Sequence, residues 1–411
     1  MKVAYFSPLP PERSGIADYS ALLLPELRRR LDVAVVERGR RRPPRGADVC
    51  LYHLGNDPQA HGWILDALRR TPGVVVLHDF VLHHLVSGVT LARKDWRAYL
   101  DALERDAGLV GRLLGYAVME KRIPPLWENR PEEFPLVREA LLHARGLICH
   151  SAYVRDRARE AGYEGPAWVV PHPAFPVPAL EPEPIRGDPL VGAFGNLNAS
   201  KRVPQLLDAF ARLRRTRPEA RLLLVGAESP GFDLDRRMQR LGLDVDGVIR
   251  EGYVEEGRLW ALMAACDLHV NLRSPTMGET SGTAIRALSL GKPLIVSGVG
   301  WFAELPDDVA VKVPVDEHET GVLAEALALL AGRPDLRASM GSAARALVER
   351  EHAPDRVADL YAAALELVAG GASVEEAVLH ETAAAAAEVG IGPGSAEAAE
   401  LARRLSEVEL G

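Results

Sequence analysis

The sequence predicts an α/β protein made of two doubly wound, Rossmann-like domains that face each other across a cleft, with C-terminal helices returning toward the first domain. Three observations support this prediction. Short apolar runs alternate with amphipathic segments in both halves, which is typical of βαβ units and a parallel sheet. A proline-rich stretch without periodicity separates the two halves. The 411 residues also suffice for two domains of ordinary size.

We expect residues 1–175 to form the first domain, 176–188 a linker, 189–354 the second domain and 355–411 a helical C-terminal segment. In the first domain, apolar runs predict strands at 2–7, 32–37, 48–56, 73–79, 146–151 and 167–172. Amphipathic patterns predict helices at 15–30 and 61–70, and residues 80–145 are mostly helical with breaks near prolines.

The alternation restarts after the proline-rich stretch. Strands are expected at 190–197, 220–227, 248–254, 267–273, 293–298 and 309–314. Helices are expected at 203–216, 233–243 and 257–266, and in "PTMGETSGTAIRALSLGKP", which runs from Pro275 to Pro293. The tail from Pro354 is alanine-rich and helical, with a break in "GIGPGS" at 390–395.

The composition excludes several classes of protein. With 47% hydrophobic and 26% charged residues, the chain is expected to be globular, and its net charge of −8 argues against a nucleic-acid binder. Cys50, Cys149 and Cys266 are too widely spaced for a zinc site or a disulfide framework. No uncharged apolar stretch reaches about 18 residues, and no signal-peptide pattern opens the chain, so we expect a cytoplasmic protein.

Charge is distributed unevenly along the chain. Residues 1–180 contain 25 Lys/Arg and 21 Asp/Glu, whereas the remainder contains 24 and 36. The first half includes the basic run "RGRRRPPR" at 38–45. Two interpretations stay open: a solvated loop, or a surface of the N-terminal domain that contacts anionic lipid or an anionic acceptor. The second would place the protein at the inner face of the membrane.

Strand ends are the candidate ligand positions, because ligands of open parallel sheets bind beyond the carboxyl ends of the strands. In the first domain, Gly15 stands where the first loop meets the first helix, so a ligand can approach its backbone. His78 ends the apolar run "VVVLHD" and can exchange hydrogen bonds with a hydroxyl near neutral pH. The alternatives are a turn glycine and a structural histidine.

The second domain offers an anion site. Lys201 and Arg202 stand just before a helix, where two cations beside helix-entry N–H groups suit a diphosphate. Thr280, Ser281, Gly282 and Thr283 form the mouth of another helix, whose backbone N–H groups also suit an anion. Glu279 beside them would repel a phosphate, so we expect this carboxylate to accept hydrogen bonds from sugar hydroxyls.

These motifs resemble the family 4 glycosyltransferases of the GT-B fold over roughly residues 1–370. The resemblance rests on "GNLNASKR" before a helix, "LLLVGA", "EGYV", "ACDLHVNLRSP" and the Glu279 loop ending in "ALSLGKPLIVS". It implies a retaining hexosyltransferase that moves a sugar from a nucleotide-diphosphate sugar to a hydroxyl of a saccharide, lipid-linked or small-molecule acceptor. It implies no metal and no cofactor, with a front-face mechanism in which the leaving phosphate oxygen helps deprotonate the acceptor.

The resemblance also assigns roles to residues. Residues 1–175 become the acceptor-side domain and 189–354 the nucleotide-sugar domain. The donor phosphates would contact Lys201 and the 281–283 N–H groups, with Gly15 close by. Glu279 would hold the donor sugar, His78 would lie near its reacting carbon, and the backbone at Tyr253 and Val254 would read the base.

Two positions depart from the family pattern. A second glutamate, which normally grips the nucleotide ribose, is replaced by Arg286, and the stretch from Glu279 is one residue shorter. Asn196 replaces a frequent arginine, so a phosphate cation is missing; Arg202, Arg273 or Arg286 are the candidates to replace it. These departures keep two alternatives open: a nucleotide-sugar 2-epimerase of the same fold, and a non-catalytic nucleotide- or sugar-binding protein.

The acceptor pocket is expected in residues 80–135, which carry no transferable motif. The aromatic residues Trp96, Tyr99 and Trp127 either line this pocket or pack within the domain.

Overall fold

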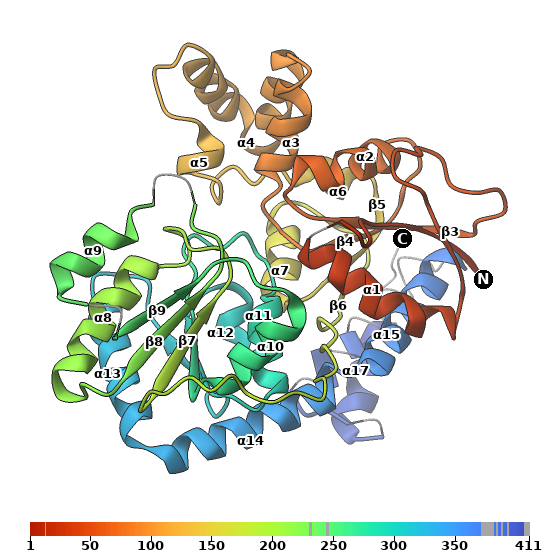
Figure 1. The fold of residues 1–411 in the computed structure, drawn as a ribbon. Coiled ribbons are helices and arrows are strands. Elements are labelled where there is room, and N and C mark those ends of the chain that lie inside the picture. The colour runs from red at the N-terminus through yellow and green to blue at the C-terminus, as the bar shows by residue number, and fades with distance from the viewer. Residues whose placement is uncertain are drawn as a thin grey trace. The chain divides into compact units, whose positions relative to one another are not determined.

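The computed structural model describes residues 1–12, 14–229, 232–243, 246–370, 382–383, 385–387, 389–392 and 394–406. The chain divides into two compact units, one made of Met1–Pro171 with Asp355–Gly411 and the other of His172–Pro354. Each unit contains a six-stranded parallel sheet with helices packed on it (Figure 1). The predicted α/β class with two Rossmann-like domains is confirmed.

The sheet of the first unit has the strand order β2-β1-β3-β4-β5-β6. Its strands are β1 (Lys2–Phe6), β2 (Asp32–Val35), β3 (Val49–Leu54), β4 (Gly73–Leu77), β5 (Ala144–Cys149) and β6 (Ala167–Val169). The helices between and after them are α1 (Gly15–Arg28), α2 (Pro58–Leu68), α3 (His83–Leu91), α4 (Trp96–Met119), α5 (Leu126–Asn129), α6 (Arg138–Leu142), α7 (Ala152–Glu160), α15 (Pro354–Ala369) and α17 (Ala396–Ser406).

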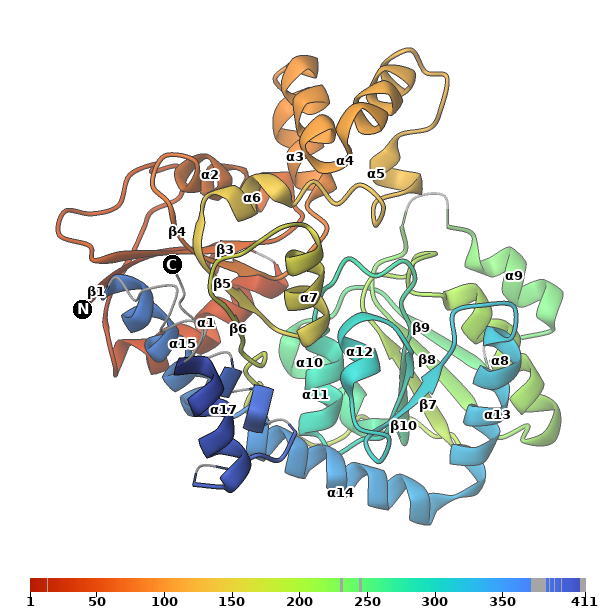
Figure 2. The same ribbon diagram turned by 180° about the vertical axis from the view of Figure 1, so that it is seen from behind.

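Helix α15 returns to the first unit, as predicted for the C-terminal segment. It lies alongside α1, and its buried side chains join the apolar core under the sheet (Figure 2). The hydroxyl groups of Tyr19 and Tyr361, both fully buried, are 2.7 Å apart. Arg30 Nε donates to Asp359 Oδ1 at 2.5 Å at the edge of this contact. Residues 371–381 of the predicted helical tail lie outside the described residues.

The sheet of the second unit has the strand order β12-β11-β10-β7-β8-β9. Its strands are β7 (Leu190–Phe194), β8 (Arg221–Val225), β9 (Val248–Glu251), β10 (Leu268–Asn271), β11 (Leu294–Ser297) and β12 (Ala310–Val313). Its helices are α8 (Val203–Thr216), α9 (Leu234–Leu241), α10 (Glu256–Ala265), α11 (Gly282–Ser289), α12 (Gly300–Glu304), α13 (Glu319–Gly332) and α14 (Pro334–Glu351).

The proline-rich stretch contains neither helix nor strand, and it is hydrogen-bonded to the second unit along its length. Ala174 N–H donates to His352 O at 2.7 Å, and Glu183 N–H donates to Ala261 O at 3.1 Å. These bonds attach the stretch to α10 and to the end of α14. Phe175 is thereby held beside α11, where it contacts a site residue described below.

Residues 80–145 are largely helical, as predicted, and Figure 1 shows α3, α4 and α5 grouped beyond the sheet. Helix α4 is interrupted at Ala107 and Gly108, whose φ and ψ angles are not helical. Neither α4 nor any other helix among the described residues combines the length and the apolar character needed to cross a membrane.

Candidate functional site

The strand order of the second sheet reverses between β7 and β10. β8 and β9 continue the sheet on one side of β7, whereas β10, β11 and β12 continue it on the other. β7 and β10 pair directly, with Val191 opposite Leu268. Ligands of such sheets bind beyond the carboxyl ends of the strands at the point of reversal. The segments that follow β7 and β10 therefore form the candidate site.

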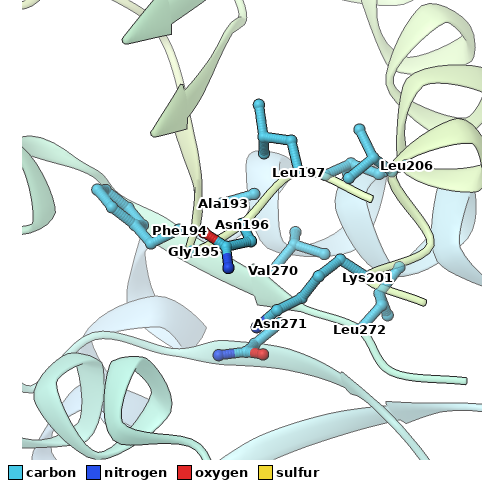
Figure 3. A pocket seen from close by; sticks show the side chains of 11 residues that line it. Ala193, Phe194, Gly195, Asn196, Leu197, Lys201, Leu206, Val270, Asn271 and Leu272 are labelled. Carbon is cyan, nitrogen blue, oxygen red and sulfur yellow. The ribbon is translucent and has the colours of Figure 1, made fainter. Parts of the chain in front are cut away.

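A tight turn after β7 brings Lys201 back to the strand end. Gly195 has a φ of +105°, which favours glycine, and a Cβ there would lie 3.3 Å from Lys201 Nζ. The Lys201 N–H donates to Asn198 Oδ1 at 3.0 Å and closes the turn. Asn196, Lys201 and Asn271 line the same pocket (Figure 3).

The side-chain amino group of Lys201 is the basic group of this pocket. Within the residues that the structure describes, its Nζ forms neither a hydrogen bond nor an ion pair. Burial, together with the nearby Arg273 cation, lowers the pKa of Lys201 to about 7, and Glu279 opposes both effects. An anion bound beside Nζ would favour the charged form.

The Glu279 carboxylate contacts residues of the segment that follows β10. Its Oε1 lies 2.5 Å from Arg273 Nε, and its Oε2 accepts a hydrogen bond from Met277 N–H at 2.8 Å. The charges of both members of this pair affect the pKa of Lys201. A sugar hydroxyl that binds to Glu279 would share or replace the contact with Arg273.

The mouth of α11 is fixed to the sheet by Asn271, the last residue of β10. Ser281 caps the helix, its Oγ accepting from Ala284 N–H at 3.3 Å. Asn271 Nδ2 donates to Ser281 Oγ and to Thr283 Oγ1, each at 2.9 Å. The N–H groups of Gly282 and Thr283 have no acceptor within the helix and carry the positive end of its dipole. They can therefore bind an anion.

Two oxygens at this mouth, Thr280 Oγ1 and Asn271 Oδ1, are buried and have no hydrogen-bond partner among the described residues. A buried polar atom without a partner costs about 1–3 kcal/mol. A ligand hydroxyl or a water that donates to these oxygens would remove that cost, so the site is suited to a hydroxyl-bearing ligand as well as to an anion.

Arg286 lies one turn into α11 and is 7% exposed. Its guanidinium carbon is 3.6 Å from the centroid of the Phe175 ring, a cation–π contact. Its Nη1 is 3.4 Å from Gly282 O, and its Nη2 donates to Glu256 Oε1 at 3.2 Å. Arg286 thus stands beside the first turn of α11, but it has an acidic partner.

Arg202 points to a different neighbour. It adopts a left-handed conformation with φ 54° just before α8, and its Nε donates to Glu319 Oε1 at 2.9 Å. Glu319, the first residue of α13, is 2% exposed. The structure therefore brings Lys201 to the site and pairs Arg202 with α13. Tyr253 and Val254 lie between β9 and α10, and the Tyr253 side chain is 63% exposed.

Gly15 is the first residue of α1 in the other unit. Ser14 caps this helix, its Oγ accepting from Ala17 N–H at 3.0 Å. Among the described residues, no atom lies within 4 Å of a Cβ built on Gly15, so the backbone leaves room for a ligand there.

His78 follows β4 and belongs to a buried group of histidines. Its Nε2 lies 2.9 Å from His53 Nδ1, and its ring centroid is 5.1 Å from that of His150. Burial, with the neighbouring His150 as the second cause, lowers the pKa of His53 well below its ordinary value. His78 is 8% exposed, which is the setting of a structural histidine; a ligand could reach only the small exposed part of its ring.

The aromatic residues of the expected acceptor pocket pack against one another. The Tyr99 ring meets Trp127 edge-on with centroids 5.8 Å apart, and Tyr99 OH is 2.9 Å from His83 Nε2. Tyr99 is fully buried. The structure thus supports the packing interpretation for Tyr99 and its neighbours.

Sequence reasoning missed Asn271, Glu256 and Phe175. Asn271 carried a signal, because it is a polar amide that ends the apolar run "DLHVN", directly before the Glu279 loop. Glu256 and Phe175 carried none, since both meet Arg286 through contacts between segments far apart in the sequence.

The sequence is similar to known glycosyltransferases over part of its length. Residues 181–347 match the family model described as glycosyl transferases group 1. Over 201 residues the chain is 29% identical to a D-inositol 3-phosphate glycosyltransferase from Saccharomonospora viridis, and the match covers 46% of each protein. The chain thus matches about half the length of this curated relative.

Solved structures share the fold over most of the chain. HepE from Anabaena in complex with UDP-glucose has a TM-score of 0.60 at 17% identity, covering 89% of this chain and 99% of that chain. Sucrose-phosphate synthase from Thermosynechococcus elongatus has a TM-score of 0.57 at 18% identity, covering 80% of this chain and 75% of that chain. At these identities the likeness establishes the fold, two Rossmann-like domains of the GT-B type.

Proposed function

We propose that this protein is a glycosyltransferase, which transfers a sugar from a nucleotide-diphosphate sugar to a hydroxyl of a saccharide, lipid-linked or small-molecule acceptor. The proposal includes retention of the anomeric configuration and independence from metal. The match of residues 181–347 to the glycosyl transferases group 1 model supports it. The fold shared with HepE, a protein solved in complex with UDP-glucose, supports it as well.

The observation that carries the proposal is the Lys201 amino group at the point where the sheet reverses, which has no hydrogen bond or ion pair with any described residue. It faces a pocket shared with Asn271, which in turn fixes the mouth of α11. A diphosphate supplies the anion that both features lack. Binding it here would restore the charge of Lys201 and satisfy N–H groups of the first turn of α11.

The chemistry follows from positioning and electrostatics. The bond between the anomeric carbon and the diphosphate oxygen breaks, and a new bond to the acceptor oxygen forms on the same face of the sugar. The acceptor proton passes to the leaving phosphate oxygen, so no protein nucleophile is needed. Lys201 and the N–H groups of Gly282 and Thr283 would stabilise the charge that grows on the diphosphate.

The remaining roles rest on the sequence resemblance. In this proposal Glu279 holds the donor sugar, with Thr280 Oγ1 available to accept from a sugar hydroxyl. Tyr253 and Val254 contact the base. The roles of Gly15 and His78 toward the donor, and any contact of the basic run at 38–45 with a membrane, stay predictions.

A donor panel tests the proposal. UDP-, GDP-, ADP- and dTDP-sugars are incubated with the protein and a mixture of hydroxyl acceptors, with and without EDTA, and the products are identified by mass spectrometry and by NMR of the anomeric proton. We expect a glycoside whose anomeric configuration matches the donor, formed equally in EDTA. An epimerised nucleotide-sugar would instead indicate a 2-epimerase, and donor binding without any product would indicate a binding protein.

A pair of lysine variants links the activity to the site. Lys201→Met should lower turnover by about 10²–10³-fold, by analogy with the loss of one charge-stabilising donor. Lys312→Ala removes a cation of the same unit that pairs with Asp307 at 2.5 Å, and it serves as the matched control. Equal activity of the two variants would contradict the role of Lys201.

A further inference from the structure

The surroundings of Arg286 and Glu256 define a second part of the proposed donor site. The Arg286 guanidinium group is stacked on Phe175 at 3.6 Å and lies 3.4 Å from Gly282 O, so its position is fixed on two sides. Trp260 of α10 adds a third contact, with its ring centroid 5.8 Å from the guanidinium carbon. The guanidinium group of Arg286 is therefore held in a fixed position, where it can orient an acidic side chain.

Glu256 is the side chain held there. It stands in the first turn of α10, and its Oε1 accepts from Arg286 Nη2 at 3.2 Å. The carboxylate side chain is 61% exposed, although its partner is buried. Within the described part of the chain, the second oxygen, Oε2, has no hydrogen-bond partner. A carboxylate that is anchored at one oxygen and open at the other can accept hydrogen bonds from a ligand diol.

The position of this carboxylate matches one part of a nucleotide. The proposed phosphate contacts lie at the first turn of α11, and the proposed base contacts lie at Tyr253 and Val254, two to three residues before Glu256. In a nucleoside diphosphate the ribose joins the base to the phosphates. The Arg286–Glu256 pair links these two regions, because Arg286 Nη1 lies 3.4 Å from Gly282 O in the first turn of α11 and Glu256 follows the proposed base contacts in the chain. A nucleotide bound to both sets of contacts would therefore carry its ribose near this pair.

We propose that Glu256 accepts hydrogen bonds from the 2′- and 3′-hydroxyls of the donor ribose and that Arg286 is the positioning residue that orients this carboxylate. The inference rests on the proposed function, because it needs a nucleotide in the site. It makes Glu256 a specificity-determining residue, selecting ribonucleotides over 2′-deoxyribonucleotides. It also gives Arg286 a role other than phosphate binding.

The test compares equilibrium dissociation constants for matched nucleotides on the full chain. UDP, GDP and ADP are each measured against their 2′-deoxy forms by calorimetry, for the unaltered protein and for Glu256→Gln, Arg286→Lys and Arg286→Met. Glu255→Gln is the matched control, because Glu255 is the exposed neighbour of Glu256 and its side chain forms no capping hydrogen bond. Inorganic pyrophosphate is measured as a ligand that has no ribose.

We expect the unaltered protein and Glu255→Gln to prefer the ribonucleotide at least about tenfold, the effect of about 1.4 kcal/mol. Glu256→Gln should reduce this preference to less than about threefold and leave pyrophosphate binding unchanged, because the amide offers one acceptor in place of the carboxylate's several. Arg286→Met should also lose the preference, and Arg286→Lys should regain part of it, since a lysine can still pair with Glu256.

Three results would overturn the inference. The first is a full ribose preference in Glu256→Gln, and the second is no ribose preference in the unaltered protein. The third is a loss of pyrophosphate affinity in Arg286→Met, which would assign Arg286 to the phosphates. If none of the nucleotides binds to the unaltered protein, the proposed function itself fails, and that outcome is distinct from all three. Because the Glu256 side chain is exposed, Glu256→Gln should fold, and its result decides the test even if an Arg286 variant does not fold.

Discussion

Above neutral pH, the protein should take up a proton when it binds a nucleotide-sugar. In the free protein, burial and the Arg273 cation hold the pKa of Lys201 at about 7. A bound diphosphate favours the ammonium form and raises this pKa. At about pH 7.5 a group with a pKa of about 7 is roughly one-quarter protonated, so binding should take up about 0.75 proton; at about pH 6 the uptake should fall to about 0.1.

The affinity follows from the same titration. Only the charged form of Lys201 pairs with the diphosphate, so affinity is fully present below the pKa of the free protein and is lost as the pH rises above it. Between about pH 7.5 and pH 8.5 the dissociation constant should rise by nearly tenfold, because each pH unit above the pKa costs about 1.36 kcal/mol.

Calorimetry in two buffers of different ionisation enthalpy, HEPES and Tris, measures the uptake directly. A nucleotide-sugar is the ligand of choice, because its diphosphate lacks the terminal phosphate group that titrates near about pH 6 in a free nucleotide. Lys201→Arg is the control, since arginine stays charged, and it should bind without taking up a proton. Equal proton uptake by Lys201→Arg and the unaltered protein would show that Lys201 is not the group that titrates on binding.

Three further predictions concern stability. Lys201→Met should raise the free energy of unfolding of the ligand-free protein by about 1–3 kcal/mol near neutral pH, a figure that is reduced for the partial exposure of the side chain. The pKa of Lys201 is lower in the folded than in the unfolded protein, so its charge destabilises the fold fully below about pH 7. The stability gained by the variant should therefore shrink toward about pH 10, as measured by urea titrations. Arg202→Ala should lower the free energy of unfolding by about 3–5 kcal/mol, because it leaves the buried Glu319 carboxylate unpaired. The double variant Arg202→Ala/Glu319→Gln should recover part of this loss. If it recovers none, the stabilising pair of Arg202 and Glu319 is contradicted. Tyr19→Phe should lower it by about 1–3 kcal/mol by removing the buried hydrogen bond to Tyr361, whereas deletion of α15 should make the same substitution nearly neutral.

The fold was predictable because it depends on a periodic pattern. The run "GVVVL" at β4 is buried at every position, as expected for a parallel strand covered on both faces. The same holds for β7, whose run "LVGAF" is followed by Gly195, the residue that turns the chain back to Lys201. These signals lie within short stretches of the sequence, so they predict the strands without knowledge of the tertiary contacts.

The site was only partly predictable, because its details depend on partners far apart in the sequence. Lys201 and Arg202 are neighbours and look equivalent in the sequence, yet the left-handed conformation of Arg202 directs its side chain to Glu319 on α13. Arg286 likewise stands out as a departure, but its stacking on Phe175 and its pairing with Glu256 are tertiary contacts. No periodicity encodes such contacts.

A crystal structure of the full chain with a nucleotide-sugar would show directly where the diphosphate binds. We expect the diphosphate to lie within hydrogen-bond distance of Lys201 Nζ and of the N–H groups of Gly282 and Thr283. Density for the diphosphate at another edge of the sheet, or a mouth of α11 filled by the protein's own side chains, would contradict it.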